Sequence, residues 1–128
     1  MAGFKDLIVY KKAFDQAMRI FEMTKSFPKE ERYSLIDQIR RSSRSVCACL
    51  SEGYRKRKYP AHFVLKMSDS DMENSETQVW LDFSLACNYI NEETHKLGLA
   101  LNEEIGRLLQ NMINNPEKYG AVQKEPRR

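Results

Sequence analysis

The sequence predicts an all-α fold, a four-helix bundle that is oligomeric. Apolar residues recur at spacings of three and four along most of the 128 residues, and no stretch alternates with a period of two. Five Gly and four Pro are few for a protein of many short strands and tight turns. A content of 41% hydrophobic and 30% charged residues is typical of a globular domain. We expect one bundle domain over residues 1–114 and a mobile C-terminal tail over 115–128.

The first helix is predicted between Asp6, which can cap its start, and Ser26. Pro28 ends it, because the residue before a proline is pushed out of the helical region. Its seam steps by three and four residues along Leu7, Tyr10, Phe14, Ala17, Phe21 and Thr24.

The second helix is predicted from about Lys29 to Arg55–Lys58, before the break at Tyr59-Pro60. One of its sides contains Leu35, Ile39, Ser42, Val46, Cys49 and Gly53. A glycine inside a helix costs up to about 1 kcal/mol relative to alanine. The small residues on this side therefore predict close approach of a neighbouring helix.

The third helix is predicted from Pro60 to about Asn91, and it has two faces of interest. One face mixes apolar with small polar residues, namely Phe63, Met67, Ser70, Asn74, Thr77, Leu81, Leu85 and Asn88. The opposite face contains Leu65, Met72, Val79, Phe83 and Ile90. A bundle helix ordinarily buries one stripe, so we predict that this second stripe is an oligomer interface. The polar residues of the first face are predicted to form a hydrogen-bonded layer rather than a ligand pocket.

The fourth helix is predicted to begin near Asn91 or Glu92, with acidic residues in its first turn. Asn114-Asn115-Pro116 ends it. One face contains Leu97, Leu101, Ile105, Leu108, Leu109, Met112 and Ile113.

Charge is distributed unevenly along the chain, although the net charge is only +3. Residues 29–59 contain nine basic and four acidic residues, whereas residues 60–104 contain two basic and nine acidic residues. The candidate nucleic-acid-binding residues are Arg40, Arg44, Arg55, Lys56, Arg57 and Lys58. They are suited to a phosphate backbone, and the interleaved Tyr54 and Tyr59 to stacking on bases. Alternatively, the basic and acidic segments attract each other within one fold or between copies.

The sequence has no arrangement of residues that indicates an enzyme. There is no Gly-rich phosphate loop and no Gly-x-Ser-x-Gly elbow, and His62 and His95 are far apart. Cys47 and Cys49 would point about 200° apart on a helix, which suits a shared zinc ion poorly. We expect no catalytic residue, no metal and no cofactor.

The cellular location is predicted from the cysteines and from the length of the apolar runs. Three cysteines without an export signal favour a reducing cytoplasm. No apolar run approaches the roughly 18–20 residues that span a bilayer, so no membrane contact is expected.

Several short motifs occur in a recognisable order. They are Phe4-Lys5-Asp6-Leu7, Phe27-Pro28-x-x-Glu31-x-Tyr33-x-Leu35, Gln38-Ile39-Arg40-Arg41-Ser42 and Glu52-Gly53. With these motifs the sequence resembles the four-helix-bundle proteins named after the intervening sequences of 23S rRNA genes. Accessory variability proteins of diversity-generating retroelements are relatives of this family. The resemblance covers about residues 4–113.

The resemblance implies an antiparallel up-down four-helix bundle, assembled as a ring-like homopentamer that is not an enzyme. It also implies possible partners, because the retroelement relatives bind nucleic acid and a reverse transcriptase through a basic surface. Two interpretations follow. The first is an accessory protein that binds the phosphate backbone of RNA or DNA through the basic helix, and the alternative is an oligomeric protein–protein scaffold without nucleic-acid binding.

Overall fold

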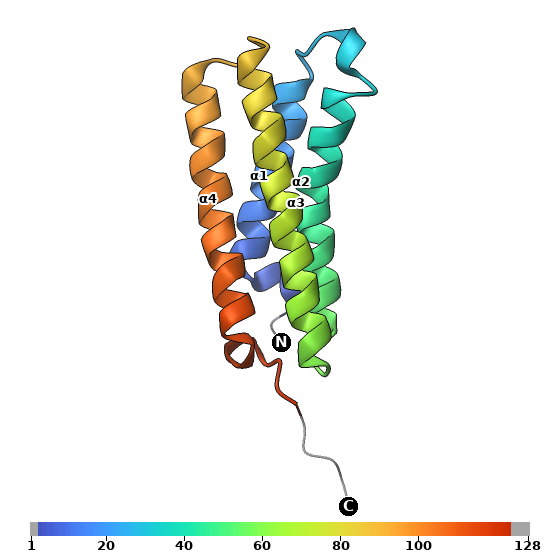
Figure 1. Ribbon diagram of the computed structural model, residues 1–128, viewed down its shortest axis with the longest axis vertical. Coiled ribbons are helices and arrows are strands. Elements are labelled where there is room, and N and C mark those ends of the chain that lie inside the picture. The colour runs from blue at the N-terminus through green and yellow to red at the C-terminus, as the bar shows by residue number, and fades with distance from the viewer. Residues whose placement is uncertain (1–2, 124–128) are drawn as a thin grey trace, which may run out of the picture.

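The computed structural model describes residues 3–123, which form four α-helices and no strand (Figure 1). The helices are α1 (Ile8–Thr24), α2 (Leu35–Arg55), α3 (Pro60–Ala86) and α4 (Glu92–Asn114). Three short 3-10 helices accompany them: η1 (Phe4–Asp6), η2 (Lys29–Glu31) and η3 (Pro116–Tyr119). The all-helical class and the four predicted helices are confirmed for the described part of the chain.

The chain passes along the long axis four times and reverses at each connection (Figure 1). α1 and α3 each pack against both α2 and α4. Within residues 3–123, α1 and α3 do not contact each other, so they occupy diagonally opposite corners of the bundle. The main core between the helices contains Val9, Ala13, Val46, Leu50, Phe63, Met67, Ile105, Leu109 and Met112.

The predicted seam of α1 is correct only in part. Ala17 and Thr24 are buried, and Leu7 and Tyr10 pack against the core as half-buried residues. The structure buries Val9, Ala13, Gln16, Ala17, Ile20 and Thr24. Phe14, which we expected in the core, is 51% exposed. Val9, Ala13, Gln16 and Ile20 form a neighbouring stripe with the same spacing of three and four residues, and the small side chain of Ala13 lets the bundle close over that stripe. Asp6 caps only the 3-10 turn, since its carboxylate accepts a hydrogen bond from the Gly3 amide at 3.0 Å.

α2 begins six residues later than predicted, because residues 29–34 form η2 and a turn. Glu31 lies in this turn, where it accepts a hydrogen bond from the Ser34 hydroxyl at 2.6 Å. It accepts another from the Tyr89 hydroxyl at 2.8 Å. Such side-chain bonds compete with helix formation and hold the turn in place.

α3 ends at Ala86 rather than near Asn91. Asn88 adopts a left-handed conformation with φ of 62°, which asparagine tolerates better than most residues. The amides of Asn88 and Tyr89 donate to the carbonyls of Leu85 and Ser84, both at 2.9 Å, which closes the helix end in a Schellman motif. Asn91 then caps α4, where its side chain accepts from the Thr94 amide at 2.8 Å.

Gly53 confirms the predicted close approach of two helices. A Cβ atom at this position would lie 2.7 Å from Cβ of Lys66 on α3 and would also meet the end of Met67. Any larger residue would push α2 and α3 apart.

The C-terminal segment follows α4 directly. Residues 116–119 form η3, and Ala121 is buried against the core. The tail predicted for 115–128 also includes residues 124–128, which lie outside the described residues.

Candidate nucleic-acid interface

The six predicted nucleic-acid-binding residues fall into two separate groups. Arg40 and Arg44 lie in the first half of α2, whereas the terminal basic cluster, Arg55–Lys58, lies at its C-terminal end. The α2–α3 connection, η1 and the end of α4 all lie at this end of the bundle (Figure 1).

Arg40 is engaged inside the protein. Its Nε donates a hydrogen bond to Oγ1 of Thr24 at 2.8 Å, and its Nη2 donates to the carbonyl of Phe21 at 3.3 Å. The guanidinium carbon lies 4.7 Å from the centre of the Phe21 ring. These contacts fix α2 to the C-terminal end of α1, where a cation is favoured by the helix dipole. The main role of Arg40 is therefore to hold α2 against α1.

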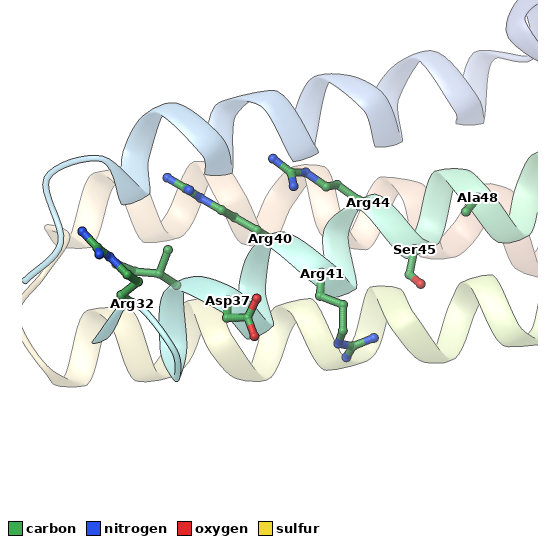
Figure 2. Close-up of a pocket in the computed structure, with 8 residues that line it drawn as sticks. Arg32, Asp37, Arg40, Arg41, Arg44, Ser45 and Ala48 are labelled. Atoms are coloured by element: carbon green, nitrogen blue, oxygen red, sulfur yellow. The ribbon is translucent and has the colours of Figure 1, made fainter. Parts of the chain in front are cut away.

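Arg44 remains exposed beside a shallow groove of about 530 Å³. The groove is lined by Arg32, Ile36, Asp37, Arg40, Arg41, Arg44, Ser45 and Ala48. Figure 2 shows Arg40 and Arg44 extending toward α1, while Arg41 points to the other side, toward α3. The basic residues of this groove therefore do not converge on one point.

Arg41 joins the basic helix α2 to the acidic helix α3 within one chain. It forms ion pairs with Glu73, at 2.8 Å, and with Glu76. Glu52 of α2 similarly pairs with Lys66 of α3 at 3.0 Å. Part of the attraction between the oppositely charged segments is thus satisfied within one fold, which is one of the alternatives that the charge pattern left open.

Arg57 also has a structural role. Its Nε donates to the Tyr54 carbonyl at 2.9 Å, and its Nη1 donates to the Tyr119 carbonyl at 3.2 Å. The guanidinium carbon lies 3.7 Å from the centre of the Tyr54 ring. Arg57 therefore fixes the segment after α4, and the ring face that it covers is closed to a stacking base.

The other residues of the terminal basic cluster point into solvent. Arg55, Lys56 and Lys58 are exposed, and none forms an ion pair with another residue in 3–123. Tyr59 beside them is 57% exposed, and Nζ of Lys56 lies 5.8 Å from the centre of its ring. An adjoining groove of about 570 Å³ is lined by Gly3, Phe4, Tyr54, Arg55, Arg57, Lys58, Gly120 and Val122. This end combines available cations with one open aromatic ring.

The predicted interface stripe is exposed along α3 but is interrupted at its end. Leu65, Met72, Val79 and Phe83 are between 47% and 67% exposed. Ile90 lies beyond the helix, half-buried in a groove that also includes Met18 of α1, because the turn at Asn88 reverses the chain.

The sequence prediction missed a second apolar surface, on α1. Ile8, Phe14 and Met18 are 64%, 51% and 45% exposed. The signal was present, since α1 has apolar residues on more than one side, as α3 does. The predicted seam assigns Phe14 to the core, whereas the structure places it on this outer surface.

The cysteines and histidines do not assemble into a reactive group in the described residues. Burial raises the pKa of the Cys47 thiol to about 11 and, to a smaller extent, raises the pKa of Cys49. His95 contacts Asp82 at 2.8 Å, and His62 lies beside Tyr59. Within residues 3–123, no three His, Cys, Asp or Glu side chains lie where they could share a metal ion. No helix there is both long and apolar enough to cross a membrane.

Comparisons with known proteins agree with the fold. The crystal structure of a protein of unknown function from the S23 ribosomal protein family of Bacteroides thetaiotaomicron VPI-5482 is 28% identical in sequence. The similarity has a TM-score of 0.75 and covers 83% of this chain and 98% of that chain. A comparison with curated proteins gives no match. The family described as 23S rRNA-intervening sequence protein matches residues 5–111, and the chain therefore belongs to this family.

Proposed function

We propose that the protein is a non-enzymatic homo-oligomer whose basic surface binds the phosphate backbone of nucleic acid. The observation that supports this function is the terminal basic cluster, in which Arg55, Lys56 and Lys58 are exposed and have no ion pair in the described residues. Basic side chains that have no partner in the protein can neutralise phosphates. This releases the counterions condensed on the nucleic acid, which favours binding to any sequence.

The proposed site is smaller than the one expected from the sequence. Arg40 and Arg57 donate to Thr24, Phe21, Tyr54 and Tyr119, so their main role is to hold the fold. The phosphate contacts are assigned to Arg44, Arg55, Lys56 and Lys58. Contacts of this kind position a protein on nucleic acid without reading bases, and we expect weak sequence selectivity. The open ring of Tyr59 favours unpaired bases over a duplex.

The homo-oligomer is supported by the exposed apolar face of α3. Covering such a face stabilises an assembly by about 25 cal/mol per Å² of apolar surface, before the cost of association. Five copies are favoured by the family resemblance. Each copy would repeat the same cationic cluster, so several weak contacts would act together on one strand.

The experiment titrates single strands, structured RNA and duplex DNA at about 50 and 200 mM salt. The test variant replaces Arg55, Lys56 and Lys58 with alanine. A matched control replaces Lys25, Lys29 and Lys96, three exposed cations at the opposite end of the bundle. We expect binding that weakens with salt, with a log–log slope reduced by about one for each phosphate contact removed in the test variant. The control should bind like the parent protein.

Two outcomes would overturn the nucleic-acid function or its location. Equal binding by the test variant would place the site elsewhere. No binding at low salt would favour the alternative, a protein–protein scaffold. That alternative is supported by the internal contacts of Arg40, Arg41 and Arg57, which explain part of the basic character without any ligand. A reverse transcriptase, the protein partner of the retroelement relatives, is then the first candidate to test.

A further inference from the structure

Two apolar surfaces lie on opposite sides of the bundle. The outer side of α1 contains an exposed apolar pair, Phe14 and Met18, one turn apart, and Ile8 is exposed on the other side of Lys11 and Asp15. The outer face of α3 contains Leu65, Met72, Val79 and Phe83. α1 and α3 occupy diagonal corners, so no single contact with one flat surface covers both. The two helices also run in the same direction along the long axis (Figure 1).

We infer that the outer face of α3 in one copy packs against the outer face of α1 in the next copy. This inference rests on the proposed homo-oligomer and names the surface that its α3 face meets. Two different patches in contact make a heterologous, head-to-tail interface. A two-fold α3–α3 contact would cover only one of the two surfaces and leave Phe14 in water, whereas the head-to-tail contact covers both.

The two faces match along the long axis. Ile8 and Leu65 lie toward the end of the bundle where α1 and α3 begin, while Met18 and Phe83 lie farther along the same direction. A rotation about an axis parallel to the helices therefore brings apolar residues of the two faces to similar levels.

A groove continues the α1 face at the end where α3 finishes. It has a volume of about 750 Å³, and Met18, Met23 and Ile90 line it together with polar residues. Methionine side chains adapt to an irregular partner and make favourable contacts with aromatic rings. We place Phe83 of the neighbouring copy at this groove. This placement also gives Ile90 a role in the interface although it lies outside the α3 stripe.

One pair of opposite charges complements the apolar match, although this side of α1 also carries an exposed acidic residue, Asp15. Lys11 lies one helical turn from both Ile8 and Phe14, and it is exposed. Asp69 lies one turn from both Leu65 and Met72. Neither charge has an ion-pair partner within residues 3–123, and opposite charges at a rim fix the register of two surfaces.

The symmetry has a consequence for the basic surface. A head-to-tail assembly about an axis parallel to the helices places every α2–α3 connection on the same rim. The terminal basic clusters of all copies would then face one side of a ring, where a single strand can contact several of them.

The test uses two variants that each remove one face. The α3-face variant has Met72→Asp and Phe83→Asp, and the α1-face variant has Phe14→Asp and Met18→Asp. In sedimentation velocity, we expect the parent protein to have a fixed mass of several protomers and each variant to be a monomer. An equimolar mixture should form a dimer, because one intact α1 face and one intact α3 face remain to pair. Circular dichroism checks that each variant keeps its helices.

The outcomes separate the inference from the proposed oligomer. An α1-face variant that keeps the parent mass, or a mixture that stays monomeric, would overturn the pairing of faces and leave the oligomer intact. A monomeric parent protein would overturn the oligomer itself. If an aspartate variant loses helicity, a disulfide cross-linking experiment takes its place. It uses two proteins, Phe14→Cys and Met72→Cys, each in a Cys87→Ser background. We expect disulfide-linked dimers only when the Phe14→Cys and Met72→Cys proteins are mixed, and a cross-link of Met72→Cys with itself would overturn the inference.

Discussion

The two faces of α3 depart from the usual arrangement of a bundle helix, because both contain large apolar residues. The inward face buries Ser70, Asn74, Thr77 and Ser84 among apolar residues, while the outward face exposes Leu65, Met72, Val79 and Phe83. Apolar character therefore does not tell which face of this helix lies in the core. What distinguishes the inward face is the set of small polar side chains that lie among its large apolar residues and form hydrogen bonds.

The buried polar groups of α3 connect it to both neighbours. Asn74 donates to the Asn102 carbonyl at 2.9 Å, and Asn102 donates to the backbone and side-chain oxygens of Asn74 at 2.7 and 2.9 Å. Toward α2, Ser70 donates to the Val46 carbonyl and Thr77 to the Ser42 hydroxyl, at 2.8 and 2.9 Å. These bonds set the register of three helices, because a sliding helix would leave buried polar groups without partners.

The largest effect is expected from a matched pair of phenylalanines on the two faces. Phe63 is fully buried and Phe83 is 52% exposed on the same helix. Phe63→Ala should destabilise the protomer by about 3–5 kcal/mol, whereas Phe83→Ala should change its stability by less than about 0.5 kcal/mol. Urea unfolding in the α1-face variant, which we expect to be monomeric, measures both. Equal losses would show that Phe83 belongs to the core of the protomer.

A smaller effect is expected from the polar layer. Asn102→Leu removes two donated hydrogen bonds and leaves the Asn74 amide oxygen buried without a donor, at a cost of about 1–3 kcal/mol. Asn114→Leu is the control, since Asn114 is exposed near the end of α4. Thermal unfolding of both variants checks the difference. A stabilised Asn102→Leu protein would mean that the layer provides specificity at the expense of stability.

The ion pairs at the edge of α3 should contribute less. Arg41 and Glu76 side chains are 44% and 37% exposed, so solvent screens their attraction. Arg41→Gln should cost at most about 1 kcal/mol, and the loss should shrink in about 1 M salt. Denaturant melts at low and high salt give the two values. A loss of several kcal/mol that salt does not change would instead indicate a desolvated network.

The smallest effect concerns the contact between Glu31, in the turn before α2, and Tyr89, in the turn after α3. Hydrogen bonds from Ser34 and then Tyr89 lower the pKa of the Glu31 carboxyl from its ordinary 4.5. The stability that Glu31 contributes is therefore present above about pH 4.5 and is lost as the pH falls through the lowered pKa. The difference in Tm between the parent protein and Glu31→Gln should shrink between about pH 6 and 3. Glu30→Gln is the neighbouring control, and a difference that grows on acidification would contradict the assignment.

The stability that the Glu31–Tyr89 contact provides should also be lost in alkali. The hydrogen bond to Glu31 raises the pKa of the Tyr89 hydroxyl from 10.0 to about 12. Its contribution to stability is present below about pH 10 and is lost as the pH rises toward 12. Tyr89→Phe should remove this alkaline dependence.

The position of the candidate site was predicted from the sequence, but which of its basic residues are free to bind a ligand was not. The clustering of Arg55–Lys58 after a helix, and the exposure of Leu65, Met72, Val79 and Phe83, follow from spacing along one chain. The engagement of Arg40 and Arg57 does not, because their acceptors on α1 and η3 are 16 and 62 residues away. Carbonyls at the ends of other elements become acceptors only when the helices are packed.

The sequence by itself determined four helices, the breaks at Pro28, Pro60 and Pro116, and the close approach at Gly53. These features depend on local backbone chemistry and on the period of the helix. Only the tertiary structure decided which stripe of α1 faces inward, where Asn88 ends α3, and which arginines remain in solvent. Periodicity gives the spacing of a stripe but not its orientation toward neighbours. That orientation is chosen by how well small and polar side chains fit between helices distant in the sequence.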